Sequence, residues 1–515
     1  MKEWFEKLEE RYSASSRKIL FSDGGRQWSE EEFCQMVIQI HNKLIESGVL
    51  RGERILLMIP VSIELYAFLY GVWSVGATAV LFDSDMTFEN RVECMKRVKP
   101  KMVFAAPKTE ILADELVKTA GLSSTKKIQE FFRNGSKKKM LEGVANYQEE
   151  YALITFTSGS TGIPKGIART YQYLEREQEL IQKYFLYREG EIDFAVMPVF
   201  TSLNAMCGVK TVIPEVNIKK NSEKIEKIVL QIQEEGVNRL IISPNLLKQF
   251  AKCMDKKNTF FENVKKVFVG GGPFYYHLLE SAERIFPNAQ IKLLYGCCEA
   301  EPIAMINTAL ITQEQKKSMR LGKGLLGGKI VEEMLVKIIK NDPNINASNM
   351  TNEEFQEICV EDTPGEIVVS GEYVLGSYLN GEGNAKNKIQ TEDTVWHRTG
   401  DLGQIREDGI LYLYGRCKEQ VCYRQEVFYP FSEESRIYEN FDVRQAAYLQ
   451  WSEERVLVVD CEQEVYKAIC KQKEKFHSDL VIQIDRIPLD RKHRSKIDYK
   501  YLREIFSKKE SQNKT

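Results

Sequence analysis

The sequence has no excess of charge of either sign. Its 515 residues include 72 lysines and arginines against 74 aspartates and glutamates, which gives a formal net charge of −2 at pH 7. A chain without an overall positive field is poorly suited to bind a polyanion, so no nucleic-acid partner is expected. Hydrophobic residues make up 43% and charged residues 28%, a composition typical of a folded protein.

Cysteine is also scarce. The eleven cysteines are scattered, no two have C-x-x-C spacing, and only Cys297 and Cys298 are adjacent. This pattern favours reduced thiols in a cytoplasmic protein over a disulfide framework or a structural zinc site.

Long hydrophobic runs are rare. The N-terminal segment is charged from Lys2 onward and has no apolar core of the kind found in signal peptides. The uncharged run Leu65–Phe82 only just reaches the roughly 18 residues at which a membrane span is considered. Gly71 and Gly76 interrupt it, so we predict a buried helix, a glycine stop and a strand, and no transmembrane span.

Short apolar runs alternate with helical stretches over the first part of the chain. Such alternation predicts an α/β fold with helix-covered, mostly parallel sheets. The predicted strands are Arg54–Pro60, Thr78–Asp83, Met102–Ala106, Tyr151–Thr157, Asp193–Pro198, Arg239–Pro244, Val264–Gly270 and Gln290–Leu294.

After about Leu321 the pattern changes. Met334–Ile339, Gly365–Ser370 and Gly409–Tyr414 are expected strands between turns, as in a small barrel-like β subdomain. Beyond Arg416 a strand, a helix and a strand (Val456–Cys461, Val465–Phe476, Leu480–Ile484) indicate a small α+β domain. The polar stretch Leu122–Lys139 is expected to be a surface connection.

An apolar strand at Tyr151–Thr157 runs into a loop rich in hydroxyls and glycine, TSGSTGIPKG. Glycine lets backbone N–H groups close around an anion, hydroxyls add donors, and a terminal lysine adds positive charge. A Ser/Gly linker is the plain alternative, but a linker would not directly follow an apolar strand. The Walker A pattern fails because Pro164 stands where glycine must precede the lysine. The predicted phosphate-binding residues are Thr157, Ser158, Gly159, Ser160, Thr161, Gly162 and Lys165.

This loop resembles the phosphate-loop signature of the adenylate-forming superfamily, which contains acyl-CoA synthetases, luciferase and peptide-synthetase adenylation domains. Further signatures follow in the same order, as far as Lys496. The resemblance implies ATP as a substrate and Mg²⁺ as a cofactor. It also implies a large N-terminal domain, 1–418, with α/β sheets in 1–320 and the β-rich subdomain in 321–418, and a mobile C-terminal lid domain, 419–515.

Two later glycine motifs imply contacts with the nucleotide. The run Val269–Pro273, VGGGP, alone indicates only a tight turn; by resemblance, Gly271 and Gly272 lie against adenine, Gly271 also bordering the acyl pocket. The run Tyr295–Glu299, YGCCE, resembles a Tyr-Gly-x-Thr-Glu motif. By that resemblance Tyr295 and Gly296 adjoin adenine and Glu299 binds Mg²⁺, a hard cation that prefers carboxylate oxygen. Cys298 replaces the usual threonine, so its contact with the α-phosphate is expected to be weakened.

Three further positions complete the resemblance. Asp401, in HRTGD, can accept hydrogen bonds from the two ribose hydroxyls, although an isolated TGD would indicate only a turn. Arg416 corresponds to a nucleotide contact and Glu419 to a hinge residue. Lys496, in the run from Pro488 to Asp498, corresponds to the catalytic lysine. The plain alternative for that run is a solvated basic tail.

The sequence indicates less clearly which reaction the acyl-adenylate undergoes after it has formed. In the resembled ligases a glycine lines the pantetheine tunnel; Gln425 stands there and could obstruct a thiol. Segments 197–200 with 208–214, 295–303 and 491–498 resemble the olefin-biosynthesis β-lactone synthetases, whose 3-hydroxy acid substrates cyclise without a thiol. Apolar Phe200 and Leu203 suit an acyl chain, although core packing explains them equally well.

Three alternatives remain open. The adenylate could pass to CoA or to a carrier protein, which Gln425 makes doubtful. The enzyme could activate an amino or aryl acid, but no aspartate for an α-ammonium group opens the segment near Phe200. The chain could also be a nucleotide-binding relative without turnover, which the presence of Lys165, Glu299, Asp401 and Lys496 disfavours.

Overall fold

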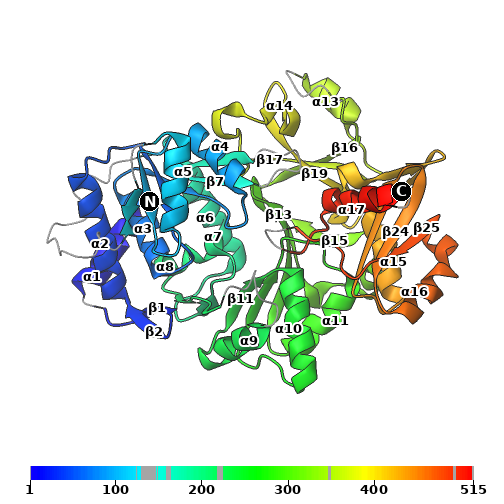
Figure 1. Cartoon of the computed structure of the whole chain (residues 1–515), viewed down its shortest axis with the longest axis horizontal. Helices are drawn as coiled ribbons and strands as arrows, with labels where there is room; N and C mark the ends of the chain where they lie inside the picture. The colour runs from blue at the N-terminus through cyan, green and yellow to red at the C-terminus, as the bar shows by residue number, and fades with distance from the viewer. Residues whose placement is uncertain are drawn as a thin grey trace. The chain divides into compact units, whose positions relative to one another are not determined.

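The computed structural model describes residues 2–14, 16–122, 125–128, 147, 149–157, 164–216, 224–345, 350–490 and 494–512 (Figure 1). The chain divides into two compact units. Unit 1 comprises Met1–Leu240 and Leu375–Asn384, and unit 2 comprises Ile241–Val374 and Ala385–Thr515. Each unit is described separately below.

Unit 1 alternates helices and strands through most of its length, as the sequence predicts. Its elements are α1 (Lys2–Ser13), β1 (Ile19–Asp23), β2 (Arg26–Ser29), α2 (Glu30–Glu46), β3 (Arg54–Met58), α3 (Ile63–Ser74), β4 (Thr78–Leu81), α4 (Phe88–Val98), β5 (Met102–Ala105), α5 (Glu110–Ala120), β6 (Thr125–Lys127), β7 (Tyr151–Thr157), β8 (Lys165–Thr170), α6 (Tyr171–Phe185), β9 (Ile192–Phe194), α7 (Pro198–Thr201), α8 (Asn204–Cys207), β10 (Lys210–Val212), α9 (Ile225–Glu234) and η4 (Leu379–Gly381).

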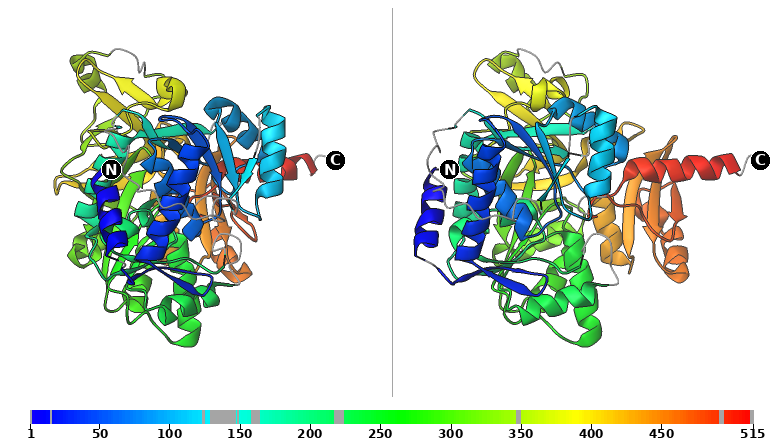
Figure 2. Two further views of the ribbon diagram at one scale, coloured as in Figure 1. Left: turned by 90° about the vertical axis from the view of Figure 1, so that its left-hand side faces the viewer. Right: turned by 60° about the vertical axis from the view of Figure 1, so that its left-hand side comes forward.

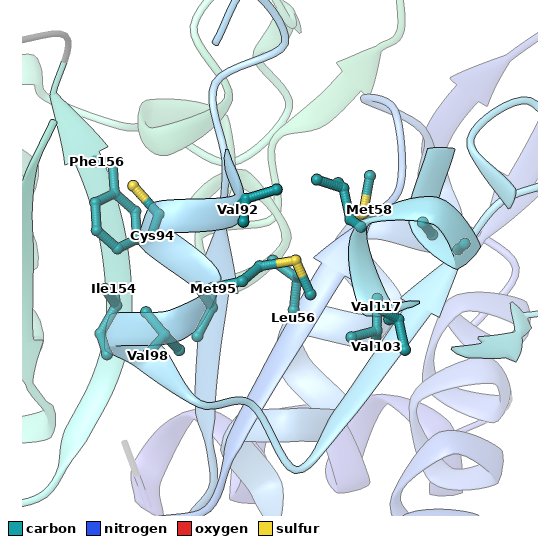
Figure 3. Close-up of a cluster of buried hydrophobic side chains, with 14 of the residues drawn as sticks. Leu56, Met58, Val92, Cys94, Met95, Val98, Val103, Val117, Ile154 and Phe156 are labelled. Carbon is teal, nitrogen blue, oxygen red and sulfur yellow. The ribbon is translucent and has the colours of Figure 1, made fainter. Parts of the chain in front are cut away.

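The main sheet of unit 1 has the strand order β6-β5-β3-β4-β7-β8. All of its pairs are parallel except β7 with β8. Cys94 and Val98 of α4 face Phe156 and Ile154 of β7, and Met95 lies near Leu56 (Figure 3). Burial of this apolar face explains why α4 and the strands form, since helical stability in proteins comes mainly from packing.

Helix starts in unit 1 follow local sequence signals. Ser29 caps α2 in a full capping box with Glu32, and Ser62 and Thr87 cap α3 and α4 with their hydroxyls. These hydroxyls accept hydrogen bonds from backbone N–H groups that have no partner inside the helix. The helix and strand predicted within Leu65–Phe82 are confirmed as α3 and β4. No helix in the described ranges is long and apolar enough to cross a membrane.

Unit 2 begins inside strand β11 and ends with the longest helix of its C-terminal part. Its elements are β11 (Arg239–Ile242), α10 (Pro244–Lys257), β12 (Lys266–Val269), α11 (Tyr276–Ile285), β13 (Gln290–Cys297), β14 (Ala300–Asn307), η3 (Thr308–Leu310), α12 (Gln313–Arg320), β15 (Leu325–Ile330), β16 (Leu335–Ile339), α13 (Asn352–Ile358), β17 (Gly365–Ser370), α14 (Asn384–Asn387), β18 (Lys388–Gln390), β19 (Val395–Ile405), β20 (Ile410–Arg416), η5 (Cys417–Glu419), β21 (Val421–Tyr423), β22 (Glu426–Phe428), α15 (Pro430–Asn440), β23 (Gln445–Trp451), β24 (Glu454–Asp460), α16 (Gln463–Cys470), η6 (Lys473–Phe476), β25 (Leu480–Gln483) and α17 (Tyr499–Gln512).

The large sheet of unit 2 runs in the order β16-β17-β19-β20-β15-β14-β13-β12-β11. Strands β12 and β13 are parallel, whereas every pair from β13 to β16 along this order is antiparallel. Strand β13 extends beyond the predicted Leu294 to Cys297, because β14 returns directly alongside it. The motif Tyr295–Glu299 therefore lies at a hairpin end.

The C-terminal part of unit 2 has a sheet of its own, in the order β23-β24-β25. Helix α17 covers one face through Leu502 and Phe506, which pack on Leu449 and Val458. Figures 1 and 2 show α17 in red beside the orange strands. The helix predicted at Val465–Phe476 is divided into α16 and η6.

Candidate nucleotide site

The two strands that flank the predicted phosphate loop, β7 and β8, pair with each other in unit 1. Thr157, the last residue of β7, pairs with Lys165, the first residue of β8. The Lys165 ammonium donates a 3.4 Å hydrogen bond to the Tyr378 hydroxyl and lies 4.8 Å from the centre of its ring. The predicted loop residues Ser158, Gly159, Ser160, Thr161 and Gly162 lie outside the described residues.

Tyr295, Asp401 and Arg416 meet in unit 2. The Tyr295 hydroxyl donates to Oδ2 of Asp401 at 3.1 Å, and Arg416 Nη1 donates to Oδ1 at 2.6 Å. The pairing of β19 with β20 places Asp401 opposite Arg416. Three sequence-predicted residues therefore form one hydrogen-bonded group.

Electrostatics stabilise this group in one protonation state. Burial, with the nearby Asp401 charge, raises the pKa of Tyr295 well above 10.0, so its hydroxyl stays protonated and donates. The Asp401 carboxylate also raises the pKa of Arg416 further above its ordinary value, so the guanidinium stays charged. Each carboxylate oxygen has two acceptor directions, which leaves room for hydroxyl donors such as those of ribose.

Glu299 is buried near the β13–β14 hairpin, with 7% of its surface exposed. One oxygen of its carboxylate, the sulfur of Cys297 and one ring nitrogen of His397 all lie within 4.8 Å of one another. Burial raises the pKa of the Cys297 thiol well above 9.0. The adjacent Cys298 is half-buried and does not belong to this group. Glu299 offers an oxygen ligand that fits Mg²⁺, with the remaining ligands left to phosphate and water.

The Lys496 loop rests on the glycine loop that follows β12. A Cβ added to Gly272 would come within 2.4 Å of Ser495 Cβ, and Ser495 Oγ accepts from Asn245 N at 3.3 Å. Asp490 supports the loop by accepting from the backbone N–H groups of Ser495 and Lys496 at 2.9 and 2.8 Å. Lys496 itself is exposed, so unit 2 brings the Gly271–Gly272 and Lys496 segments together.

Gly272→Ala is expected to slow adenylation by about tenfold to a hundredfold, since a displacement of about 1 Å at a reacting centre has effects of this size. The added methyl group would displace Ser495 and with it Lys496. Pyrophosphate release from ATP and acid measures the effect. Gly376→Ala is the matched control, because a Cβ there meets nothing within 4 Å.

A second substitution tests whether a steric clash causes the slower adenylation of Gly272→Ala. In Gly272→Ala/Ser495→Gly the opposing Cβ is removed, so most of the lost rate should return. A double variant as slow as Gly272→Ala would contradict the steric explanation.

The remaining predicted positions are more dispersed. Glu419 forms an ion pair with Arg503 of α17, with Oε1 3.1 Å from Nη1. Phe200 and Leu203 are almost fully buried in unit 1, where Phe200 stacks on Phe185 at 5.1 Å. Gly271 belongs to unit 2. The acyl-pocket assignment of these three residues stays a prediction.

Gln425 lies at the tip of the β21–β22 hairpin. Arg424 and Gln425 both have positive φ, 49° and 71°, and β21 and β22 pair directly around them. Two-residue hairpin turns with two positive φ angles favour glycine or asparagine. The exposed Gln425 therefore occupies backbone geometry suited to the glycine of the resembled ligases.

Sequence reasoning missed four residues that contact the site: Tyr378, His397, Asp490 and Ser495. His397 and Ser495 stand inside quoted motifs, but nothing in the motifs assigns them a contact. Asp490 precedes Lys496 closely, and an Asp-x-x-x-x-Ser-Lys spacing is compatible with a loop closed by its own carboxylate. Tyr378 gives no local signal, since it lies far along the chain from Lys165.

Comparison with known proteins identifies the family. The model of the AMP-binding enzyme family matches residues 8–379. An olefin beta-lactone synthetase of Stenotrophomonas maltophilia (strain K279a) is 25% identical over 395 residues, covering 73% of this chain and 69% of its own. A 4-coumarate–CoA ligase of Petroselinum crispum is 25% identical over 420 residues, covering 76% and 72%.

A similar fold is found among solved structures. O-succinylbenzoate coenzyme A synthetase from Bacillus subtilis, in complex with ATP and magnesium ion, has a TM-score of 0.74 and 18% identity, covering 94% of this chain and 97% of its own. Since the family model matches well over half of the sequence, the chain belongs to the AMP-binding enzyme family and is an AMP-forming ligase.

Proposed function

We propose that this ligase activates a 3-hydroxy fatty acid as its acyl-adenylate, and that the hydroxyl of the substrate then closes a β-lactone with release of AMP. The Tyr295–Asp401–Arg416 group supports nucleotide binding. The similarity to an olefin beta-lactone synthetase supports the second step. The observation that carries the second step is Gln425, in a turn geometry that favours glycine.

In the first step a carboxylate oxygen of the acid bonds to the α-phosphorus of ATP, and pyrophosphate leaves with the electrons of the broken P–O bond. Negative charge increases around phosphorus, so catalysis depends on positioning and electrostatic stabilisation. We assign that stabilisation to Lys496 and to the phosphate loop with Lys165. Asp401 accepts from the ribose hydroxyls and Tyr295 borders adenine. Glu299 would hold Mg²⁺, which would supply positive charge to offset that of the departing pyrophosphate.

In the second step the 3-hydroxyl oxygen bonds to the acyl carbon while the bond from that carbon to the phosphate oxygen breaks. AMP leaves with the electrons of that bond, and the hydroxyl proton is released to solvent. A nucleophile within the same molecule reacts at a high effective molarity, which helps to offset the strain of a four-membered ring. No thiol takes part, so an obstructing side chain at position 425 does not impede this reaction.

Transfer of the adenylate to CoA or a carrier protein is the second candidate. The similarity to a 4-coumarate–CoA ligase, also 25% identical, favours it. The two candidates differ in substrate and in product. Lactone formation requires a 3-hydroxyl group and no thiol, whereas ligation requires a thiol and no hydroxyl.

The deciding experiment incubates the protein with Mg-ATP and either a 3-hydroxy fatty acid or its unsubstituted analogue, with and without CoA. AMP and lactone are expected from the 3-hydroxy acid alone, whether or not CoA is present. Thioester formation that depends strictly on CoA with the plain acid would refute the lactone proposal. Failure of every acid to release pyrophosphate would instead indicate a nucleotide-binding relative without turnover.

Gln425→Gly tests the role of the side chain directly. If Gln425 obstructs a thiol arm, this variant should form detectable acyl-CoA where the wild-type protein forms none. Arg424→Gly is the matched control, because it relieves the neighbouring positive φ without opening position 425. Equal thioester formation by both variants would assign the effect to the backbone of the turn.

A further inference from the structure

One group of side chains in unit 2 combines sulfur, nitrogen and oxygen donors. Cys297 ends β13, Glu299 follows in the hairpin, and His397 lies on β19. One ligand atom from each lies within 4.8 Å of the other two. Glu299 is 7% and His397 3% exposed. The three donors therefore converge in a largely buried space.

The hydrogen bonding of His397 suits a metal ligand. Its Nδ1 lies 3.1 Å from the backbone carbonyl oxygen of Asn387. Because a carbonyl oxygen only accepts, Nδ1 carries the hydrogen, and the ring lone pair is then on Nε2. Histidines that bind metals usually donate the other ring N–H to a carbonyl or carboxylate in this way, which sets both tautomer and ring orientation.

The donor set also discriminates among metals. Mg²⁺ prefers oxygen ligands, whereas thiolate and imidazole select transition metals such as Zn²⁺ and Co²⁺. In a tetrahedral zinc site, bonds of about 2.0–2.3 Å separate the ligand atoms by roughly 3.5 Å. The ligand atoms, now within 4.8 Å of one another, would have to approach by up to about 1.3 Å to reach that separation. Three protein ligands leave a fourth position open to an exogenous oxygen.

We propose that Cys297, Glu299 and His397 bind a thiophilic divalent transition-metal ion such as Zn²⁺. The ion bonds to the sulfur, the carboxylate oxygen and Nε2, and the Cys297 thiol releases its proton to solvent on binding. A phosphate oxygen or water fills the fourth position. The spacing of the cysteines could not predict this site, because only the fold brings His397 close to Cys297 and Glu299.

Metal binding at this site would affect the adenylation reaction, and this one effect rests on the proposed function. Glu299 is also the residue assigned to Mg²⁺. Because one carboxylate cannot serve both sites fully, Zn²⁺ should inhibit adenylation competitively with respect to Mg²⁺. Binding of the metal by itself requires no turnover, so the two statements can fail separately.

Titration of the metal-free protein with Co²⁺ tests the site by absorption. A thiolate bound to Co²⁺ gives a near-ultraviolet charge-transfer band, which identifies cysteine as a ligand independently of activity. One equivalent of Co²⁺ should produce this band, and Zn²⁺ should abolish it. Cys297→Ser should remove the band, and His397→Gln should weaken Co²⁺ binding by at least about tenfold. Cys298→Ser, the adjacent cysteine outside the group, should retain it.

A second measurement uses the wild-type protein, so that a misfolded variant cannot decide the outcome. Zn²⁺ should protect Cys297 from alkylation by iodoacetamide, as read by mass spectrometry of its peptide, with exposed Cys422 as an unprotected reference. No charge-transfer band and no protection would overturn the proposal, as would a band that persists in Cys297→Ser. Metal binding in a protein that releases no pyrophosphate would uphold the site and contradict the proposed function.

Discussion

Replacing Lys496 with alanine is expected to slow acid-dependent pyrophosphate release by at least about a hundredfold, with little change in ATP binding. The basis is electrostatic: one preorganised donor or charge aimed at a transition state commonly contributes a factor of 10²–10³. Lys496 is an exposed cation on a loop whose Ser495 packs against Gly272. Its assigned contact is with charge that develops during reaction, so ground-state binding should change little.

The local structure separates this effect from unfolding. The loop is held by its backbone, because Asp490 accepts from the N–H groups of Ser495 and Lys496, and Asp490 N donates to Lys496 O at 2.7 Å. Truncation of an exposed side chain leaves these contacts in place. Exposed substitutions of this type usually change the free energy of unfolding by no more than about 0.5 kcal/mol.

Pyrophosphate release at saturating ATP measures the rate, and fluorescent-nucleotide titration measures ATP binding. Lys500→Ala is the matched control, because Lys500 is an exposed lysine in the same C-terminal stretch and no role in the reaction is assigned to it. It should retain the wild-type rate. A Lys496→Ala variant with unchanged turnover would mean that the wrong lysine has been assigned.

Local patterns identified about half of the strands that the structure describes. The apolar runs within Thr78–Asp83 and Met102–Ala106 became β4 and β5, because strands buried on both faces need continuous apolar sequence. Strand β14 was not predicted. Its sequence follows β13 after a turn without glycine or asparagine at its centre, so the usual hairpin signal is missing.

The motifs also identified residues that the fold brings together, such as Tyr295 and Asp401, which are 106 positions apart. Motif spacing could not identify their packing partners. Asn245 and Ser495 are 250 positions apart, and His397 reaches Cys297 and Glu299 from another strand. Such contacts depend on how the elements pack in three dimensions, which no local periodicity encodes.

Another long-range contact of this kind involves a buried acid. The Glu434 carboxylate on α15 is fully buried and accepts hydrogen bonds from the Tyr275 and Tyr499 hydroxyls and from Tyr448 N. Tyr499 Oη and Tyr448 N both lie 3.0 Å from Oε1. The carboxylate thus joins α15 to β23, to the start of α17 and to the residue before α11.

Glu434→Gln is expected to remove a pH dependence from the stability of this region. Burial, partly opposed by the three donors and reinforced by the Glu419 charge, raises the pKa of Glu434 from 4.5 to about 7. The folded state therefore takes up a proton between these pH values, and stability falls as pH rises through the window. The difference in pKa corresponds to about 3 kcal/mol over the full window, of which about 2 kcal/mol falls between pH 5.5 and 8.

Amide hydrogen exchange of the β23 peptide Gln445–Trp451, corrected for intrinsic rates, reports the free energy of local opening at pH 5.5 and at pH 8. Other groups titrate in both proteins, so the informative quantity is the difference between variant and wild type. That difference should move by about 2 kcal/mol in favour of Glu434→Gln as pH rises. Glu426→Gln, which removes an exposed carboxylate from the same unit, should show no such movement. A difference that stays constant would mean that Glu434 is charged in the folded protein across this range, despite its burial, because its three donors outweigh desolvation.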